Sequence, residues 1–179
     1  MSNLRFLVLV GIVLVAAVMR IIPHPPNFTP ISAMALFGGA SFPTTSVAFI
    51  VPLAAMSLSD LFLGGFDATM PFVYGSFAVS VCLGLWIRQR PSVLRIGAAA
   101  LISAVLFFVI SNFGVWLVGG LYPRTAEGLI ACYVAAVPFF RQTLLGDLIY
   151  TAALFGGFAF MQRFFPLLRG KSETATESA

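Results

Sequence analysis

Two carboxylates, Asp60 and Asp147, stand inside apolar segments and are the residues of this sequence most able to do chemistry. A charged side chain at the centre of a bilayer costs about 2.5–3.5 kcal/mol even on the lenient insertion scale, so such an acid usually faces a cavity, a partner or a ligand. Arg141 lies too far before Asp147 in the sequence to make a good pair with it on one helix. We therefore expect both acids to contact a ligand or another helix.

Further polar residues extend this prediction to a binding site. His24, the only histidine, lies between prolines on a stiff segment, where it could contact a substrate or simply be solvated. Asn112 could instead bond two helices, which is the more common role, and Tyr74 and Arg141 could anchor their helices at the membrane surface. The predicted substrate-binding residues are His24, Asn27, Asp60, Asp67, Tyr74, Cys82, Asn112, Arg141 and Asp147.

The composition indicates that much of this chain is surrounded by lipid rather than water. Hydrophobic residues make up 60% of the sequence and charged residues only 9%, whereas a soluble domain carries about 25% charged residues. Lipid must therefore surround much of the chain. We expect a single transmembrane domain at residues 1–170 and a disordered cytoplasmic tail at 171–179. The charges sit at the ends of apolar segments and do not form a nucleic-acid-binding patch, and no P-loop is present to hydrolyse ATP.

Breaks between the apolar segments predict an all-α bundle of six transmembrane helices. We expect these helices at about residues 4–22, 31–41, 45–64, 70–88, 93–118 and 142–165. The second is too short for a comfortable span and is predicted to be tilted or re-entrant. The stretch from Thr125 to Phe140, interrupted by Pro138, is predicted to form a separate interfacial helix before the last span. Small residues are predicted to let helices approach closely in the runs 37–40, 97–100 and 152–157.

The distribution of Lys and Arg predicts that both termini are cytoplasmic. Six crossings place most of the basic residues inside, namely Arg5, Arg88, Arg90, Arg95, Arg163, Arg169 and Lys171, and leave Arg20, Arg124 and Arg141 outside. In this orientation Asp60, Asn112 and Asp147 lie roughly 7–10 Å below the outer surface. We expect them to line a polar cavity that opens outward beneath a lid formed by residues 23–30.

Several runs of residues resemble a family of bacterial membrane proteins labelled as transport proteins. These are HPPNFTPI at 24–31, ALFGGA at 35–40, LSDLFLG at 58–64, MPFVYGSF at 70–77 and PFFR at 138–141. That family in turn resembles the substrate-binding S components of energy-coupling-factor vitamin transporters. The resemblance covers nearly the whole chain and implies a bacterial inner-membrane protein that takes up a vitamin-like small molecule, together with an energising module. The first helix lacks the Ala-x-x-x-Ala docking motif of many S components, which suggests a solitary protein.

Within that class the chain resembles the solitary cobalamin transporter type. The resemblance implies cobalamin as the first candidate substrate, with His24 near the corrin and Cys82 as a ligand of its cobalt, and it implies no intrinsic cofactor. From the residues alone, Cys82 is more simply a side chain that fills space between helices. Two other functions stay open: an intramembrane enzyme that uses His24 with Asp60 or Asp67 as an acid–base pair, and a ligand-free helix-packing subunit of a membrane complex.

Overall fold

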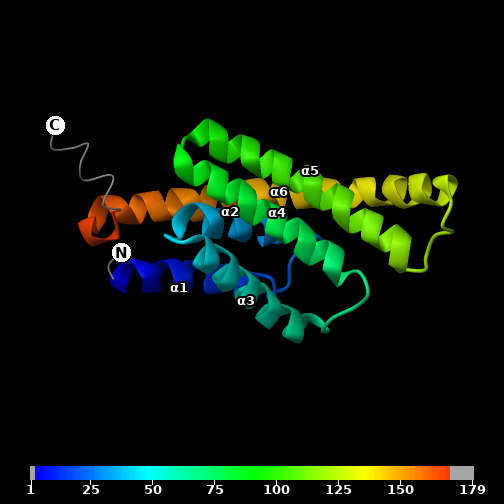
Figure 1. Cartoon of the computed structure of the whole chain (residues 1–179), viewed down its shortest axis with the longest axis horizontal. Coiled ribbons are helices and arrows are strands. Elements are labelled where there is room, and N and C mark those ends of the chain that lie inside the picture. The colour runs from blue at the N-terminus through cyan, green and yellow to red at the C-terminus, as the bar shows by residue number, and fades with distance from the viewer. Residues whose placement is uncertain (1–2, 170–179) are drawn as a thin grey trace.

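The structure, a computed structural model, describes residues 3–169, and the predicted tail at 171–179 lies outside them. Within this range the chain is all-helical (Figure 1). The elements are α1 (Asn3–Met19), α2 (Ile31–Ser41), α3 (Thr45–Leu63), α4 (Met70–Gln89), α5 (Val93–Val118), α6 (Ala126–Phe164) and the short 3-10 helix η1 (Pro166–Leu168). These bounds confirm the first five predicted helices to within a few residues.

Four of the helices, α3, α4, α5 and α6, are long and apolar enough to cross a membrane. The other two are shorter, with 17 residues in α1 and 11 in α2. At 1.5 Å per residue, α2 extends over only about half of a hydrocarbon core roughly 30 Å thick. The prediction of a helical membrane protein is therefore confirmed, and a short second helix is confirmed with it.

Polar residues at the helix starts explain why three of the elements begin where they do. Thr44, Ser92 and Thr125 precede α3, α5 and α6, and each hydroxyl accepts a hydrogen bond from the backbone N–H three residues further on, at 3.4, 3.2 and 3.2 Å. These bonds satisfy donors that the first turn of a helix otherwise leaves unpaired.

The short helix α2 forms the centre of the bundle. Its residues 32–39 are all buried, and it contacts each of the other five α-helices. A helix that is apolar on every side is stable only when protein covers it all round. The small residues predicted to allow close approach do so here, because a Cβ on Gly39 would collide with the backbone of α4 at Val81, and one on Gly84 with the backbone of α2 at Leu36.

The glycines of the other small-residue runs do not pack in this way, although Ala99 and Ala100 of the run 97–100 are fully buried. A Cβ added at Gly97, Gly156 or Gly157 would meet nothing within 4 Å. The prediction that these runs mediate close helix contacts is therefore wrong at those glycines. Small residues allow two helices to approach closely, but a contact forms only where another helix lies on the side of the small residue.

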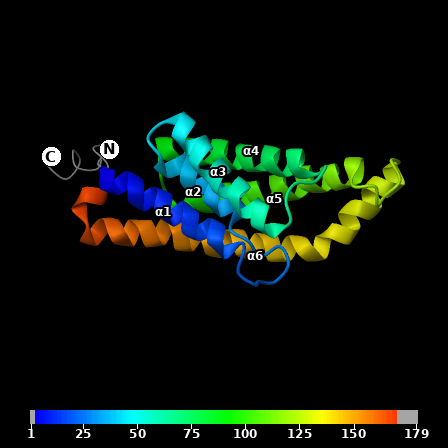
Figure 2. The same ribbon diagram turned by 90° about the horizontal axis from the view of Figure 1, so that it is seen from below.

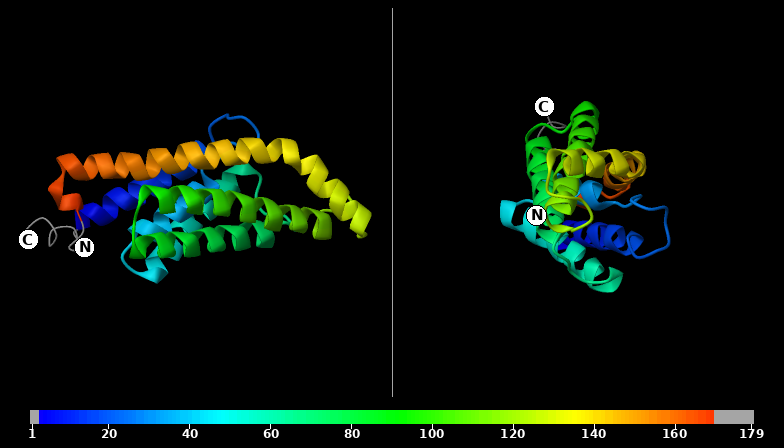
Figure 3. Two further views of the ribbon diagram at one scale, coloured as in Figure 1. Left: turned by 90° about the horizontal axis from the view of Figure 1, so that it is seen from above. Right: turned by 90° about the vertical axis from the view of Figure 1, so that its right-hand side faces the viewer.

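The final helix corrects a second prediction. The separate interfacial helix expected from Thr125 to Phe140 does not exist, because α6 continues without a break from Ala126 to Phe164 and contains Pro138. Proline removes one backbone hydrogen bond and bends a helix, whereas ending the helix in an apolar environment would leave several groups unsatisfied. The helix is about 58 Å long, and Figure 3 shows it bending where it extends with α5 past the rest of the bundle.

The chain runs up and down through the bundle, so that its two described ends meet. Figure 2 shows the start of α1 and the end of α6 at the same end of the molecule, and η1 contacts α1. The segment 20–30, which joins α1 to α2, bulges from the side of the bundle next to α6 (Figures 2 and 3). This segment positions the residues described next.

Candidate functional site

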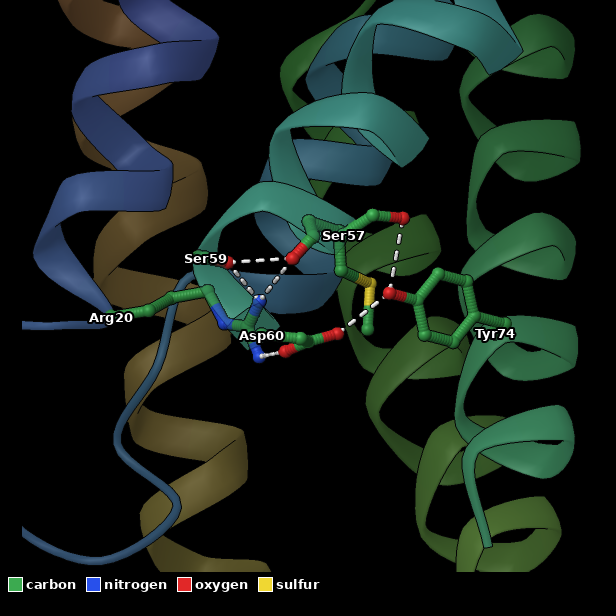
Figure 4. A network of polar contacts seen from close by, with 6 residues as sticks. Arg20, Ser57, Ser59, Asp60 and Tyr74 are labelled. Atoms are coloured by element: carbon green, nitrogen blue, oxygen red, sulfur yellow. Dashed lines mark hydrogen bonds and ion pairs between the residues drawn. The ribbon is translucent and has the colours of Figure 1, made fainter. Parts of the chain in front are cut away.

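A buried ion pair joins the end of α1 to the end of α3. Arg20 Nη2 lies 2.6 Å from Asp60 Oδ1, and the two side chains are only 7% and 3% exposed. Arg20 Nη1 also donates to the backbone carbonyl of Met56 at 3.2 Å and to the hydroxyl of Ser59. Figure 4 shows the guanidinium reaching across to α3 from just beyond the end of α1. A buried charge requires this kind of partner, because an uncompensated one is strongly unfavourable.

Tyr74 on α4 adds a third helix to this cluster. Its hydroxyl donates to Asp60 Oδ2 at 2.7 Å and lies 3.1 Å from the hydroxyl of Ser57. Both carboxylate oxygens of Asp60 are therefore used, one by Arg20 and the other by Tyr74 (Figure 4). The prediction that Asp60 has a partner on another helix is confirmed, and Asp60 and Tyr74 lie together as members of one predicted set.

One buried donor of the cluster has no acceptor. Arg20 Nε makes no hydrogen bond within residues 3–169. Near this cluster, an apolar groove of about 250 Å3 runs between α1 and α3. The groove is lined by Leu14, Ala17, Val18, Ile21, Ala55, Leu58, Ser59 and Phe62. Arg20 is not itself a lining residue, but it stands in the chain between two that are, Val18 at the end of α1 and Ile21 just after it, and its Nη1 bonds a third, Ser59.

The second intramembrane acid, Asp147 on α6, lies at the start of the central helix. It accepts hydrogen bonds from the backbone N–H groups of Ser32 and Ala33 and from the Ser32 hydroxyl. The residue that precedes α2, Pro30, provides no side-chain cap. Asp147 therefore caps α2 from a neighbouring helix, where a negative charge meets the positive end of the helix dipole. Its predicted partner on another helix is confirmed, but that partner is separate from the Asp60 cluster.

The predicted lid packs closely against α6. Gly146 lies against the backbone of Phe28 and Thr29, since an added Cβ there would come within 3.2 Å of it. The ring of Phe28 also contacts that of Tyr150, with centroids 5.6 Å apart. The segment 20–30 thus carries Arg20 at one end, rests on α6 beside Asp147, and leads into α2 at the other.

Three residues expected near the ligand lie on the surface loops. His24 is half-buried, and its Nδ1 is 2.6 Å from the carbonyl of Ile22. Asn27 is exposed, with a positive φ of 62° in the turn. Asp67 is exposed and accepts hydrogen bonds from the backbone N–H and hydroxyl of Thr69. These bonds, the Thr69 hydroxyl first, lower the pKa of Asp67 below its usual value.

The remaining predicted residues point elsewhere. Cys82 is exposed on α4 rather than part of its buried face, so it does not lie on the floor of a cavity with Tyr74. Arg141 is exposed near the middle of α6, not at the start of a final span. Asn112 bonds its own helix through the carbonyl of Phe108 at 2.8 Å. The predicted set therefore does not converge on one cavity among the residues that the structure describes.

Arg20 is a functional candidate that the sequence prediction missed. The prediction counts it only among the outer basic residues, whereas the structure pairs it with Asp60. A basic residue and an intramembrane acid at matching depths on neighbouring helices are a signal for an ion pair. The sequence carries part of that signal, because Arg20 is one of three basic residues predicted on the outer side, but it does not choose among Arg20, Arg124 and Arg141.

Comparison with known proteins places the chain in a family. No curated protein and no solved structure matches it. Residues 1–168, nearly the whole chain, match a family of unknown function, DUF6580. The chain therefore belongs to the family DUF6580.

Proposed function

We propose that this protein is a membrane uptake protein that binds a small, mostly apolar molecule between α1 and α3. The observation that carries the proposal is the unpaired Nε–H of the buried Arg20, whose chain neighbours Val18 and Ile21 and bonded partner Ser59 line the apolar groove. Buried donors are almost always paired, so a free one next to a groove favours a ligand that brings the acceptor. A carboxylate or carbonyl oxygen on the ligand would serve.

The dimensions of the groove favour a ligand smaller than a corrinoid. Its volume of about 250 Å3 lies just below the range of roughly 300–1,000 Å3 typical of pockets for drug-sized ligands. The exposure of Cys82 also removes the reason for placing cobalt beside it. Cobalamin stays a prediction of the resemblance, while the geometry supports a smaller vitamin-like molecule with one polar group.

The proposed orientation is that of six crossings in a bacterial inner membrane with both termini in the cytoplasm. The meeting of α1 and η1 at one end of the bundle supports an even number of crossings. The basic residues at that end, including Arg5, Arg88 and Arg95, support its assignment to the cytoplasm. The Arg20–Asp60 cluster then faces the outer half of the membrane, from which the ligand would enter.

The alternative of an intramembrane enzyme gains less support. An acid–base pair requires His24 within hydrogen-bond reach of a carboxylate. Among the described residues its ring bonds a backbone carbonyl, Asp60 is held by Arg20 and Tyr74, and Asp67 is held by Thr69. The groove beside Arg20 likewise favours a binding protein over a ligand-free packing subunit.

The test is to identify small molecules that co-purify with the full chain, by mass spectrometry, and to repeat the measurement with the groove filled. Val18→Trp adds bulk to an exposed lining residue, so it can block the groove without disturbing the core. Val15→Trp is the matched control, because Val15 is similarly exposed on the same helix but does not line the groove. We expect a compound that co-purifies with the wild type and Val15→Trp and is lost in Val18→Trp.

A second variant tests the polar contact. Arg20→Lys keeps the positive charge beside Asp60 but removes the Nε–H donor. Losing a hydrogen bond to a charged group costs about 1.5–3 kcal/mol, so affinity for the identified compound should fall roughly tenfold to a hundredfold. Equal retention of the same compounds by wild type and Val18→Trp would refute the proposed site.

A further inference from the structure

We propose that Asp147 and Thr151 on α6 form a binding site for a monovalent cation, Na⁺ or a proton, at the start of α2. The proposal concerns a different cluster from the groove between α1 and α3, and it stands whether or not a substrate binds there. It begins from two buried oxygen atoms that have no hydrogen-bond partner, Asp147 Oδ2 and Thr151 Oγ1.

Capping of α2 accounts for only one of the two carboxylate oxygens of Asp147. The hydrogen bonds from Ser32 and Ala33 at the start of α2 leave Oδ2 unpaired, although the residue is only 1% exposed. Thr151, 4% exposed, stands one turn further along the same helix with its hydroxyl unpaired. Residues four apart are neighbours on a helix face, so the two side chains that carry the free oxygens share one face of α6. A buried carboxylate oxygen left without a partner is costly, and a small cation removes that cost.

No basic side chain neutralises Asp147 from the helices packed on α6. The helix α2 contains no ionisable residue, and the only one in α5 is Arg95, whose guanidinium lies over the ring of Trp86 on α4. On α6 itself the nearest basic residue, Arg141, is exposed. Tyr150 is the one titratable side chain close to Asp147 in the chain, and its ring contacts Phe28.

The other charged groups near this level are already engaged. Arg20 is paired with Asp60, and the ring of His24 bonds a backbone carbonyl. Arg5 of α1 lies over the ring of Phe158, about three turns further along α6. The positive end of α2 is therefore the main compensation that the described residues offer to Asp147.

A cation at this site would act on the central helix. Oxygen ligands from a carboxylate and a hydroxyl suit a hard cation, and the carboxylate alone suffices for a proton. Positive charge on Oδ2 draws electron density away from Oδ1 and weakens its hydrogen bonds to the N–H groups of Ser32 and Ala33. Because α2 contacts every other α-helix, cation binding would thereby alter the packing of the whole bundle.

Three variants separate this role from simple capping. Asp147→Asn keeps an oxygen to cap α2 but removes the charge. Thr151→Val keeps the shape and removes a hydroxyl that has no partner, so it should not destabilise the cation-free protein. Thr143→Val is the matched control, because Thr143 lies on the same helix and its hydroxyl donates to Phe139 instead.

The assay is the melting temperature of the purified full chain in detergent. NaCl is exchanged for choline chloride at constant ionic strength, and in a second series the pH is varied in choline chloride. A cation that binds only the folded state raises the melting temperature. We expect a shift of at least about 2–4 °C in the wild type and in Thr143→Val, and none in Asp147→Asn.

The variants also identify the cation. A response to Na⁺ that is lost in both Asp147→Asn and Thr151→Val assigns the site to sodium. A response to acid that is lost in Asp147→Asn but kept in Thr151→Val assigns it to a proton, which needs only the carboxylate. If neither Na⁺ nor acid shifts the wild type more than it shifts Asp147→Asn, Asp147 is only a helix cap and the proposal is overturned.

Discussion

Replacing Asp60 by leucine would leave the guanidinium of Arg20 buried without its countercharge. The same change removes the acceptor of the Tyr74 hydroxyl, which still lies 3.1 Å from Ser57. Breaking a buried ion pair by removing one partner costs about 3–5 kcal/mol. For a chain of this size each kcal/mol corresponds to about 2–4 °C, so the melting temperature should fall by roughly 6–20 °C.

The double variant Arg20→Met, Asp60→Leu should recover most of that loss. It replaces both charges by apolar side chains, and such replacements of buried pairs are often neutral or stabilising. The Ser59 hydroxyl keeps its bond to the carbonyl of Met56 in the double variant, so few polar groups are left unpaired. Asp67→Leu is the control variant, because Asp67 is an exposed acid. Losing its local hydrogen bonds should lower the free energy of unfolding by only about 1 kcal/mol.

Unfolding of the full chain in detergent can be followed by the fluorescence of Trp86 and Trp116, the only tryptophans. The informative quantity is the difference between the single and the double variant. If Asp60→Leu is as stable as the wild type, or if the double variant is no more stable than the single one, Arg20 and Asp60 do not form a buried pair. The proposed arrangement of Arg20 and Asp60 near the groove would then be wrong.

Two further predictions concern topology and packing. Reporter fusions after Arg90 and Lys171 should report cytoplasm and a fusion after Arg124 periplasm; a periplasmic signal at Arg90 would contradict six crossings. Gly39→Ala should destabilise the protein in a thermal melt, because its Cβ collides with the backbone of α4, whereas Gly156→Ala, which meets open space, should be stabilising by up to about 1 kcal/mol. Equal effects of the two alanines would mean that α2 and α4 are not in backbone contact.

Much of the fold is legible in the sequence because it depends on local chemistry. Low charge and long apolar segments indicate a membrane protein, and the breaks between those segments predict the bounds of the first five helices to within a few residues. The cost of a carboxylate in an apolar segment likewise indicates that Asp60 and Asp147 have partners outside their own helices.

The identity of those partners depended on the tertiary structure. Arg20 and Ser32 are distant in sequence from the acids they bind, and nothing local selects one partner from another. The continuity of α6 through Pro138 also follows from its surroundings, since proline can either bend or end a helix. The exposure of Cys82 was likewise not predictable from the sequence, because an apolar helix has no polar face that shows which side is buried.

The sequence by itself therefore determined the class of the protein, the extent of its first five helices and the presence of two paired acids. Only the tertiary structure decided that the acids occupy separate clusters, that Arg20 retains a free donor beside a groove, and that Asp147 retains a free oxygen at the start of α2. The physical reason is that helix formation is governed by neighbours along the chain, whereas pairing and leftover hydrogen-bonding capacity are governed by neighbours in space.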